Sequence, residues 1–498
     1  MPLIKNPLFS RLGRIRQLNN AWAIYPSGLN TRYIHSLGVM HLAGMFTGNI
    51  LHRSLEELRG YMDLDSNKIE GIIRILRFWG LIHDIGHGPF SHAFEFYVLF
   101  NKGYNHETIV PEIYKHDKSF KDVIDDFANK MKTYYGGSLS AQLLLDIFRP
   151  IQLQKELKKH KLLKALSKLI MGPTYSIDEF DYLLRDSHFC GTKEYGTIDW
   201  QRIMDLTRVI ISERTKKPML ILEEKALQAL IDYYWAKFFM YNAVYYHNRC
   251  HAIEKYLRDI FIFLDEQKTF DPYLDKPNFK NYHLLDDSFI LNTLYDNKVK
   301  LKSSPLKKIY SDYYQKLIDL YNFEIPYTFI GKKNNPDITL KISLQKPMER
   351  INISMECQKE FINVVREMFL EKIKELRKGD NNQVLVEKLE GVCEKYVDEV
   401  FFHHVLISAN DKDFFKIKSP RDLIITPHVQ PTTKNFYMLN EQMKEENIVD
   451  KYKDLLKRIP IYAYESKILI PNALHKALTE DFPDMIEDIK ACYEKVKV

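Results

Sequence analysis

The segment LIHDIGHGPFSH at residues 81–92 concentrates side chains that can bind a metal ion or transfer a proton. His83, Asp84, His87 and His92 lie within ten positions, and seven of the 17 histidines fall in the first 106 residues. Imidazole and carboxylate groups together are the ligand mixture of Zn, Fe, Mn and Ni sites. Burying so many polar rings without a common role would cost free energy. The pattern therefore predicts a metal site, against the alternative of separate histidines that pack in a core.

Two predicted helices position these side chains. Apolar residues at helical spacing from about residue 69 indicate a helix that His83 and Asp84 close. Two glycines and a proline then break the helix, and Ser91 is placed to cap the next one. On this second helix, His92 and Glu95 are three residues apart and share a face.

Helical periodicity dominates the chain up to about residue 325. The exception is RVIISERTKKPMLILEE, whose two β-rich runs around a charged turn predict a hairpin. Beyond residue 325, three stretches favour strands around a long amphipathic helix, namely PDITLKISLQ, EVFFHHVLIS and RDLIITP. We predict a mainly α protein, with a helical catalytic domain at residues 1–325 that includes the hairpin. A smaller α+β lobe at residues 326–498, serving oligomerisation or regulation, would follow it.

Composition narrows the class of protein. The 498 residues carry a mild net charge of +6, which suits an anionic ligand without requiring nucleic acid. Five scattered cysteines predict free thiols in a reducing compartment. With no secretory signal and no apolar run long enough for a bilayer, we expect a cytoplasmic protein and no membrane partner. KELKKHKLLKALSKL is predicted as a surface helix, and nucleic-acid binding through its lysines is the less favoured role.

Four motifs carry a resemblance to a known family. HDIGHGPFSH resembles the signature of the HD-domain phosphohydrolases, closest to the branch that acts on deoxynucleoside triphosphates (dNTPs). This branch includes the bacterial dGTPases and the sterile-alpha-motif/HD proteins of animals. RIRQLNNAWAIYPSGLNTRYIHSLGV is similar to the segment around the first metal histidine of that branch, and YNHE and IDEFDYLLRDSHFCGT match later motifs in order. The resemblance covers roughly residues 7–255, about half the chain, and four ordered motifs are more specific than one HD dipeptide.

The resemblance implies a divalent metal cofactor, whose identity stays open among Mg, Mn, Fe, Ni, Co and Zn. The implied ligands are His35, His83, Asp84 and Asp178. SIDE at residues 176–179 fits a capping box, which places Asp178 in the first turn of a helix. Asp181 is expected to pair with Arg185 at i+4.

In that branch, water activated by the metal attacks the α-phosphorus and triphosphate leaves in one piece. The deoxynucleoside 5′-oxygen then needs a proton, and His92 is the expected donor. Glu95 and His106 are expected to support it through a carboxylate–imidazole pair, which raises the pKa of an imidazole. The animal branch usually has an aspartate where Glu95 stands, so the longer side chain alters the geometry of the pair.

The substrate positions also follow by resemblance. Arg32, His87 and Lys237 match phosphate-facing residues, and Gln17 and Leu18 match residues on the 3′ side of the sugar. The remaining matches are a sugar-stacking tyrosine, a partner of the 3′-hydroxyl and a residue near the sugar and base; these are Tyr182, Asp186 and Tyr245.

Two departures from the family bear on substrate and regulation. Glu179 stands where the animal branch has a phosphate-binding lysine. Its carboxylate would repel triphosphate unless it turns away from the substrate to cap the helix. The positions of the animal guanine-nucleotide activator site are Lys5, Ser10 and Gly13, which do not fit that site. Three nearby arginines, Arg11, Arg14 and Arg16, remain for the anion of another effector nucleotide.

Three functions remain open at this point. The first is a metal-dependent dNTP triphosphohydrolase that assembles as a homo-oligomer. The second is an HD-type phosphohydrolase of another nucleotide, or a nuclease. The third is a protein that senses nucleotides or binds nucleic acid without turnover.

Overall fold

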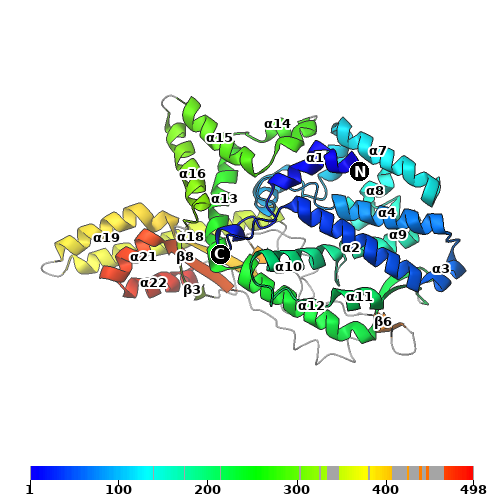
Figure 1. The fold of residues 1–498 in the computed structure, drawn as a ribbon. Coiled ribbons are helices and arrows are strands. Elements are labelled where there is room, and N and C mark those ends of the chain that lie inside the picture. The colour runs from blue at the N-terminus through cyan, green and yellow to red at the C-terminus, as the bar shows by residue number, and fades with distance from the viewer. Residues whose placement is uncertain are drawn as a thin grey trace. The chain divides into compact units, whose positions relative to one another are not determined.

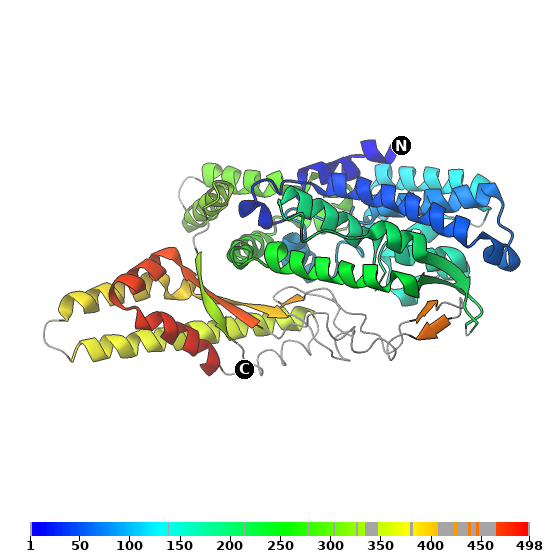
Figure 2. The same cartoon turned by 60° about the horizontal axis from the view of Figure 1, so that its bottom comes forward.

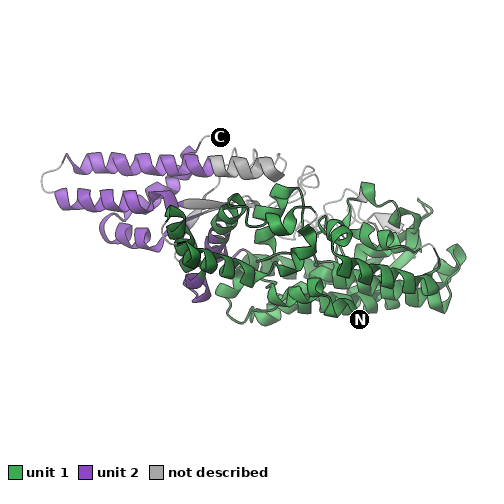
Figure 3. Cartoon of the chain, turned by 90° about the horizontal axis from the view of Figure 1, so that it is seen from above, with its two compact units in different colours: residues 1–245, 257–317, 429–460 green, residues 246–256, 318–428, 461–498 purple. Residues whose placement is uncertain are grey.

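The computed structural model describes most of the chain, which divides into two compact units (Figure 3). Unit 1 comprises residues 1–245, 257–317 and 429–460, and unit 2 comprises residues 246–256, 318–428 and 461–498. The domain boundary near residue 325 stays a prediction. The described residues are 2–137, 139–172, 174–213, 215–276, 278–301, 304–324, 327–333, 347–378, 382–406, 423–425, 437–439, 445–447 and 465–496.

Three helices form the centre of unit 1. Helix α2 (Arg32–Arg53) packs on α4 (Ser66–Ile82) and on α10 (Ile177–Phe189), as Figure 1 and Figure 2 show. Helix α4 begins three residues earlier than the sequence predicts, because Asp65 caps it by accepting a hydrogen bond from Lys68 N at 2.7 Å. Its fully buried side chains recur every three or four residues, as a helix packed on one face requires: Ile72, Ile75, Leu76 and Trp79.

Other helices surround this centre. On the N-terminal side they are α1 (Pro7–Ser10), α3 (Leu55–Tyr61), α5 (His92–Phe94), α6 (Val110–His116), α7 (Lys118–Tyr135), α8 (Ala141–Leu145) and α9 (Lys161–Leu166). Beyond α10 they are α11 (Trp200–Leu206), α12 (Leu227–Met240), α14 (Asp271–Leu274) and α15 (Asp287–Lys300). Helices α13 (Asn248–Glu266) and α16 (Pro305–Tyr321) have residues in both units. The short helical turns include η2 (Arg11–Arg14), η11 (Tyr241–Tyr245) and η12 (Asn278–Leu284).

The predicted hairpin is present. Strands β1 (Thr207–Ile211) and β2 (Pro218–Glu223) pair antiparallel, with Thr207 opposite Leu222. Two short strands extend this sheet, since β6 (Tyr437–Leu439) pairs parallel with β2 and β7 (Glu445–Asn447) pairs antiparallel with β6.

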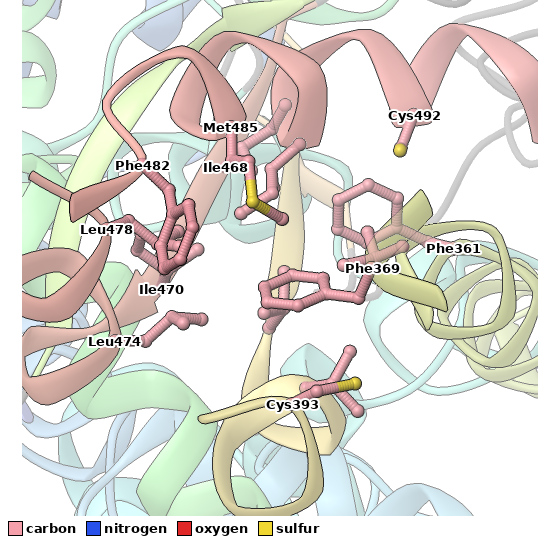
Figure 4. Packing of buried hydrophobic residues seen from close by; sticks show 14 of the residues in the cluster. Phe361, Phe369, Cys393, Ile468, Ile470, Leu474, Leu478, Phe482, Met485 and Cys492 are labelled. Atoms are coloured by element: carbon pink, nitrogen blue, oxygen red, sulfur yellow. The ribbon is translucent and has the colours of Figure 1, made fainter. Parts of the chain in front are cut away.

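Unit 2 is an α+β unit. Its sheet has the order β3 (Tyr327–Lys333), β8 (Glu465–Pro471), β4 (Phe401–Leu406), β5 (Leu423–Ile425). Its helices are α18 (Pro347–Leu376), α19 (Gln383–Tyr396), α21 (Asn472–Asp481) and α22 (Asp484–Cys492). Aromatic residues of α18 pack with residues of β8, α21 and α22 in one apolar core, including Phe361, Phe369, Ile468, Leu478 and Met485 (Figure 4). The predicted class, a mainly α chain with a short hairpin and an α+β lobe, is therefore confirmed.

Other expectations have mixed outcomes. The strands predicted in EVFFHHVLIS and RDLIITP are β4 and β5, whereas PDITLKISLQ lies outside the described residues. The lysine-rich helix predicted at 155–169 is wrong, because that segment forms three short pieces: η8 (Leu157–Lys159), α9 and η9 (Ser167–Leu169). All five cysteines lie among the described residues, where they are buried and form no disulfide. Among the described helices, none combines the length and apolarity that a membrane crossing requires.

Candidate active site

The four residues expected to bind metal come from three elements of unit 1. His35 lies in the first turn of α2, His83 and Asp84 directly follow α4, and Asp178 lies in the first turn of α10. His35 Nε2 is 3.2 Å from His83 Nε2 and 3.6 Å from Asp84 Oδ2. Asp178 Oδ1 is 3.0 Å from His35 Nε2 and 3.5 Å from His83 Nε2. Side chains from distant parts of the sequence thus meet in one cluster, in which His35, His83 and Asp84 are buried and the Asp178 side chain is 30% exposed.

The orientation of the two imidazoles suits a metal ion. His35 Nδ1 donates to Asp181 Oδ2 at 2.8 Å, and His83 Nδ1 donates to the carbonyl of Gly80 at 2.8 Å. With both Nδ1 atoms engaged, both Nε2 atoms turn into the pocket beside the carboxylates. Metal-bound histidines are held in this way in proteins, by a carboxylate or carbonyl on the second ring nitrogen. The donor set of His35, His83 and Asp84 is compact enough for one ion, so the residues present fit a divalent metal.

The charges in the pocket also favour a cation. Burial alone would lower the pKa of His35, yet hydrogen bonds to Asp178 and Asp181 raise it to about 10. Burial would raise the pKa of Asp178, but the hydrogen bonds and charges of His35 and His83 hold it below its usual value. The pKa of Asp84 is also held well below its usual range against burial, mainly by Arg32. The carboxylates therefore stay ionised, and the pocket requires positive charge.

Asp181 has a larger role than its spacing indicates. The expected pair with Arg185 is present, with Arg185 Nη2 donating to Asp181 Oδ1 at 2.7 Å. The other oxygen accepts from His35, which an i,i+4 pattern within α10 cannot reveal. Gly38 makes room for this carboxylate, because a Cβ atom there would lie 1.8 Å from Asp181 Oδ1. A glycine one turn after His35 was the available signal in the sequence.

The three residues expected to transfer a proton also lie together. Glu95 Oε2 accepts from His92 Nδ1 at 2.8 Å, and Glu95 Oε1 accepts from His106 Nδ1 at 2.7 Å. Burial would lower the pKa of His106, but the Glu95 charge and hydrogen bond raise it to about 9. Gly86 allows this approach, since a Cβ atom there would lie 1.9 Å from the His106 carbonyl oxygen. The longer Glu95 side chain thus reaches both imidazoles at once.

His87 and Arg32 lie between the two groups. The buried His87 ring stacks on His106 with centroids 4.0 Å apart, and His87 Nε2 is 3.4 Å from Asp84 Oδ1. Burial and the charge of Arg32 lower the pKa of His87 well below its usual value. Within the part of the chain that the structure describes, His87 Nδ1 has no hydrogen-bond partner. Arg32 Nη1 pairs with Asp84, and Arg32 Nε donates to Ser91 Oγ at 2.7 Å.

The three residues expected at the sugar lie together, in two hydrogen-bonded groups that ring contacts of Tyr245 with Tyr182 and Tyr241 join. Tyr245 donates to Asp186 Oδ2 at 2.9 Å, and the Tyr182 and Tyr241 hydroxyls lie 3.2 Å apart. Asn30 donates to the other oxygen of Asp186 at 2.8 Å. Burial raises the pKa of Asp186 to about 6. Asn30 and Tyr241 were missed by sequence reasoning, because neither has a motif spacing to mark it.

The remaining expected substrate residues have different surroundings. Leu18 is buried, and Gln17 N donates to the carbonyl of Asn30 at 2.9 Å. Lys237 is almost fully buried, and its ammonium group donates to Glu179 Oε1 at 2.8 Å. Ser176 caps α10 by accepting from Glu179 N, but the Glu179 carboxylate binds Lys237. The expected turn of this carboxylate toward the cap is therefore wrong.

Two further expectations concern the arginines at residues 11–16 and the capping role of Ser91. The fully buried Arg11 binds carbonyl groups, Arg14 pairs with Asp286, and the Arg16 guanidinium stacks on Trp22 at 4.0 Å. Arg11 is therefore not available for an effector anion, whereas such a role for Arg14, whose side chain is 52% exposed, and for Arg16 stays a prediction. Ser91 precedes α5 but does not cap it by its side chain, because its hydroxyl donates to the carbonyl of Arg16.

Comparison with known proteins identifies part of this region. The model of the HD domain matches residues 32–164, a range that includes every predicted metal and proton-transfer residue except Asp178. The chain is 26% identical over 308 residues to the uncharacterized protein MG461 of Mycoplasma genitalium, covering 60% of this chain and 63% of that protein.

Two further relatives have named activities. The deoxynucleoside triphosphate triphosphohydrolase SAMHD1 of Gallus gallus is 28% identical over 273 residues, covering 52% of this chain and 42% of the relative. The SAMHD1 homolog of Dictyostelium discoideum is 28% identical over 298 residues, covering 58% and 51%. The chain thus spans between two fifths and two thirds of the length of these three curated relatives.

Replacing Gly38 by alanine tests the support of His35 by Asp181. The added Cβ displaces the Asp181 carboxylate, so we expect Gly38→Ala to weaken Mn²⁺ binding by about tenfold or more. Isothermal titration calorimetry measures this, with circular dichroism to check the fold. Gly48→Ala on the same helix is the control, because its Cβ would meet only Ile73 Cδ1 at 3.8 Å. Equal Mn²⁺ affinities of the two variants would contradict the role of Asp181.

The raised pKa of His106 predicts a pH dependence of stability. Because the pKa is about 9 in the folded chain and 6.5 ordinarily, the stabilisation is fully present below pH 6.5 and is lost as pH rises through about 9. Glu95→Gln removes the main cause, so we expect its free energy of unfolding to fall less between these pH values. Urea titrations at several pH values measure this, and Glu107→Gln is the control with a smaller effect. Parallel curves for wild type and Glu95→Gln would refute the pairing.

Proposed function

We propose that this HD-domain chain hydrolyses dNTPs to a deoxynucleoside and inorganic triphosphate with a divalent metal ion. The HD domain at residues 32–164 supports a phosphohydrolase, and two relatives carry the name of a triphosphohydrolase. The observation that carries the proposal is the meeting of His35, His83, Asp84 and Asp178 beside a second group with an imidazole–carboxylate–imidazole arrangement.

The roles follow from the geometry. A divalent metal held by the first group would lower the pKa of water and polarise a phosphoryl oxygen. Attack of water at the α-phosphorus forms a new P–O bond and breaks the bond to the 5′-oxygen. That oxygen leaves with a negative charge and needs a proton. His92 is the donor in this proposal, because Glu95 holds its Nδ1 and leaves Nε2 for the leaving group.

His87 and the tyrosine–aspartate network would bind the substrate. The His87 Nδ1 atom lacks a partner among the described residues and can donate to a phosphate oxygen in the tautomer that carries the ring hydrogen on Nδ1. Asp186 and Tyr245 supply an acceptor and a donor suited to a sugar hydroxyl. Tyr182 places an aromatic ring beside Tyr245, with centroids 6.0 Å apart, as a face for the sugar.

One contact favours a second candidate, a phosphoester with fewer negative charges than a triphosphate. Glu179 Oε1 accepts from Lys237, so the ammonium group that would face phosphate is already neutralised. Burial raises the pKa of Glu179, although Lys237 opposes the change. An ionised carboxylate at this point repels a triphosphate, which carries about four charges, more than it repels a monophosphate.

Product analysis tests the proposed reaction. We expect purified protein with Mn²⁺, Mg²⁺ or Co²⁺ to release deoxynucleoside and triphosphate in equal amounts from a dNTP, as resolved by chromatography. Asp84→Asn should reduce the rate by at least about a hundredfold, because a neutral amide is a poor metal ligand. Asp232→Asn, at an exposed position, is the matched control. Release of pyrophosphate, or orthophosphate alone, would show cleavage at another bond and refute the proposed reaction. Hydrolysis of a deoxynucleoside monophosphate without turnover of any dNTP would favour the second candidate.

Glu179→Gln tests the charge at the phosphate end. The amide keeps a hydrogen-bond acceptor for Lys237 but removes the negative charge, so we expect the KM for a dNTP to fall by about three- to tenfold. The KM for a deoxynucleoside monophosphate should fall less, since repulsion scales with the charge of the ligand. Glu194→Gln is the control at an exposed position. A shift of the same size for both ligands would exclude this role of Glu179.

A further inference from the structure

A buried arginine donates hydrogen bonds to the main chain of the loop at residues 85–91, which carries part of the candidate site. Arg11 is fully buried in η2, and its Nη2 donates to the carbonyls of Ile85 and His87 at 2.8 and 2.7 Å. Its Nη1 donates to the carbonyls of Leu285 and Tyr282 at 3.0 and 3.3 Å. Its guanidinium also lies over the Tyr282 ring, 4.5 Å from the centroid. Burial lowers the pKa of Arg11 although Tyr282 and Asp286 oppose the change, so keeping this charge buried costs free energy.

Two further side chains bind the same loop from residues 282–287. The Tyr282 hydroxyl donates to the carbonyl of Gly86 at 2.7 Å. Asp287, which is 6% exposed, accepts from Phe90 N at 2.7 Å and from Arg16 N at 3.1 Å. Neither residue contacts a predicted metal ligand by its side chain. All their hydrogen bonds to the loop are to its main chain.

The loop needs external support because its backbone is strained. Phe90 and Ser91 have φ angles of 53° and 55°, values that residues with a Cβ rarely adopt. Such a conformation costs free energy and persists only when the surrounding structure holds it. Asp287 binds the amide of Phe90 at this point, directly before His92 begins α5.

We infer that Arg11, Tyr282 and Asp287 form a main-chain clamp that positions residues 84–92 for metal binding and proton transfer. Arg11 and Tyr282 fix three successive carbonyls, from Ile85 to His87, and so set the direction of Asp84 before them. Asp287 fixes the turn that aims His92. These are positioning residues, since none of them offers an atom to the metal or to the proposed substrate.

Metal binding and kinetics together test the clamp. The variants are Arg11→Met, Arg11→Lys, Asp287→Asn and Tyr282→Phe, with Tyr310→Phe as a control at a buried tyrosine of α16. Calorimetry with Mn²⁺ alone measures metal affinity, and kcat and KM are measured with dNTP and Mn²⁺. Circular dichroism gives the folded fraction of each variant, and metal affinity and kcat are calculated per folded molecule. A variant that is only less stable then shows no change in either value.

We expect Arg11→Met and Asp287→Asn to weaken Mn²⁺ binding by about tenfold or more, in the range known for groups that orient metal ligands. Their kcat should fall while KM changes less than about twofold, and Arg11→Lys should restore part of both losses. If Arg11→Met does not fold, Tyr282→Phe decides, with Mn²⁺ binding about threefold weaker than in Tyr310→Phe. Unchanged Mn²⁺ affinity and kcat per folded molecule would overturn the clamp.

The inference rests on the proposed metal centre. Metal affinity and dNTP turnover, measured separately, distinguish a failure of the clamp from a failure of the proposed function. A wild-type protein that binds Mn²⁺ without cleaving dNTPs refutes the proposed function, and the clamp is then decided by Mn²⁺ affinity alone. A wild-type protein that binds none of Mn²⁺, Mg²⁺ and Co²⁺ refutes both.

Discussion

Two imidazole nitrogens that face each other in a carboxylate-lined pocket are the constraint on which the site depends. His35 Nε2 and His83 Nε2 are 3.2 Å apart, and their Nδ1 atoms are already engaged with Asp181 and Gly80. Two lone pairs at this distance repel each other, and the ionised carboxylates of Asp84 and Asp178 add negative charge. Only a cation between them, a proton or a metal ion, makes the arrangement stable.

The helices bring this arrangement about by close approach. Helices α2 and α4 pack at Gly80, where a Cβ atom would lie 3.0 Å from the Val39 carbonyl oxygen. Gly38 on α2 admits the Asp181 carboxylate of α10. Small residues at these two contacts of α2 therefore allow the close approach that brings the histidines together, and apolar side chains of α4 are buried beside them.

Periodicity and turn residues report local structure, and they predicted the fold class and the hairpin. The full set of residues that meet at the site came from the resemblance of four ordered motifs to a known family. The sequence did not reveal hydrogen-bond partners that are distant along the chain and meet only in the folded structure. Asp181 shows its i,i+4 pair with Arg185 in the sequence, but its bond to His35 spans 146 positions. Glu179 fits a capping box in the sequence, yet in the structure a buried lysine 58 positions away competes successfully for its carboxylate. Where several polar partners are available, tertiary packing decides among them, and no local pattern encodes that choice.

The clamp has a consequence for how the protein is made. Arg11 and the loop at 85–91 leave the ribosome early, but Tyr282 and Asp287, which hold the same loop, are translated about 200 codons later. A nascent chain folds in the order in which its segments emerge. Helices α2, α4 and α10 can assemble first, but the strained turn at Phe90 gains its acceptor only once α15 has been synthesised. A ribosome stalled before that point would carry a polypeptide that contains all four predicted ligands but lacks two of the three side chains that hold the loop beside them.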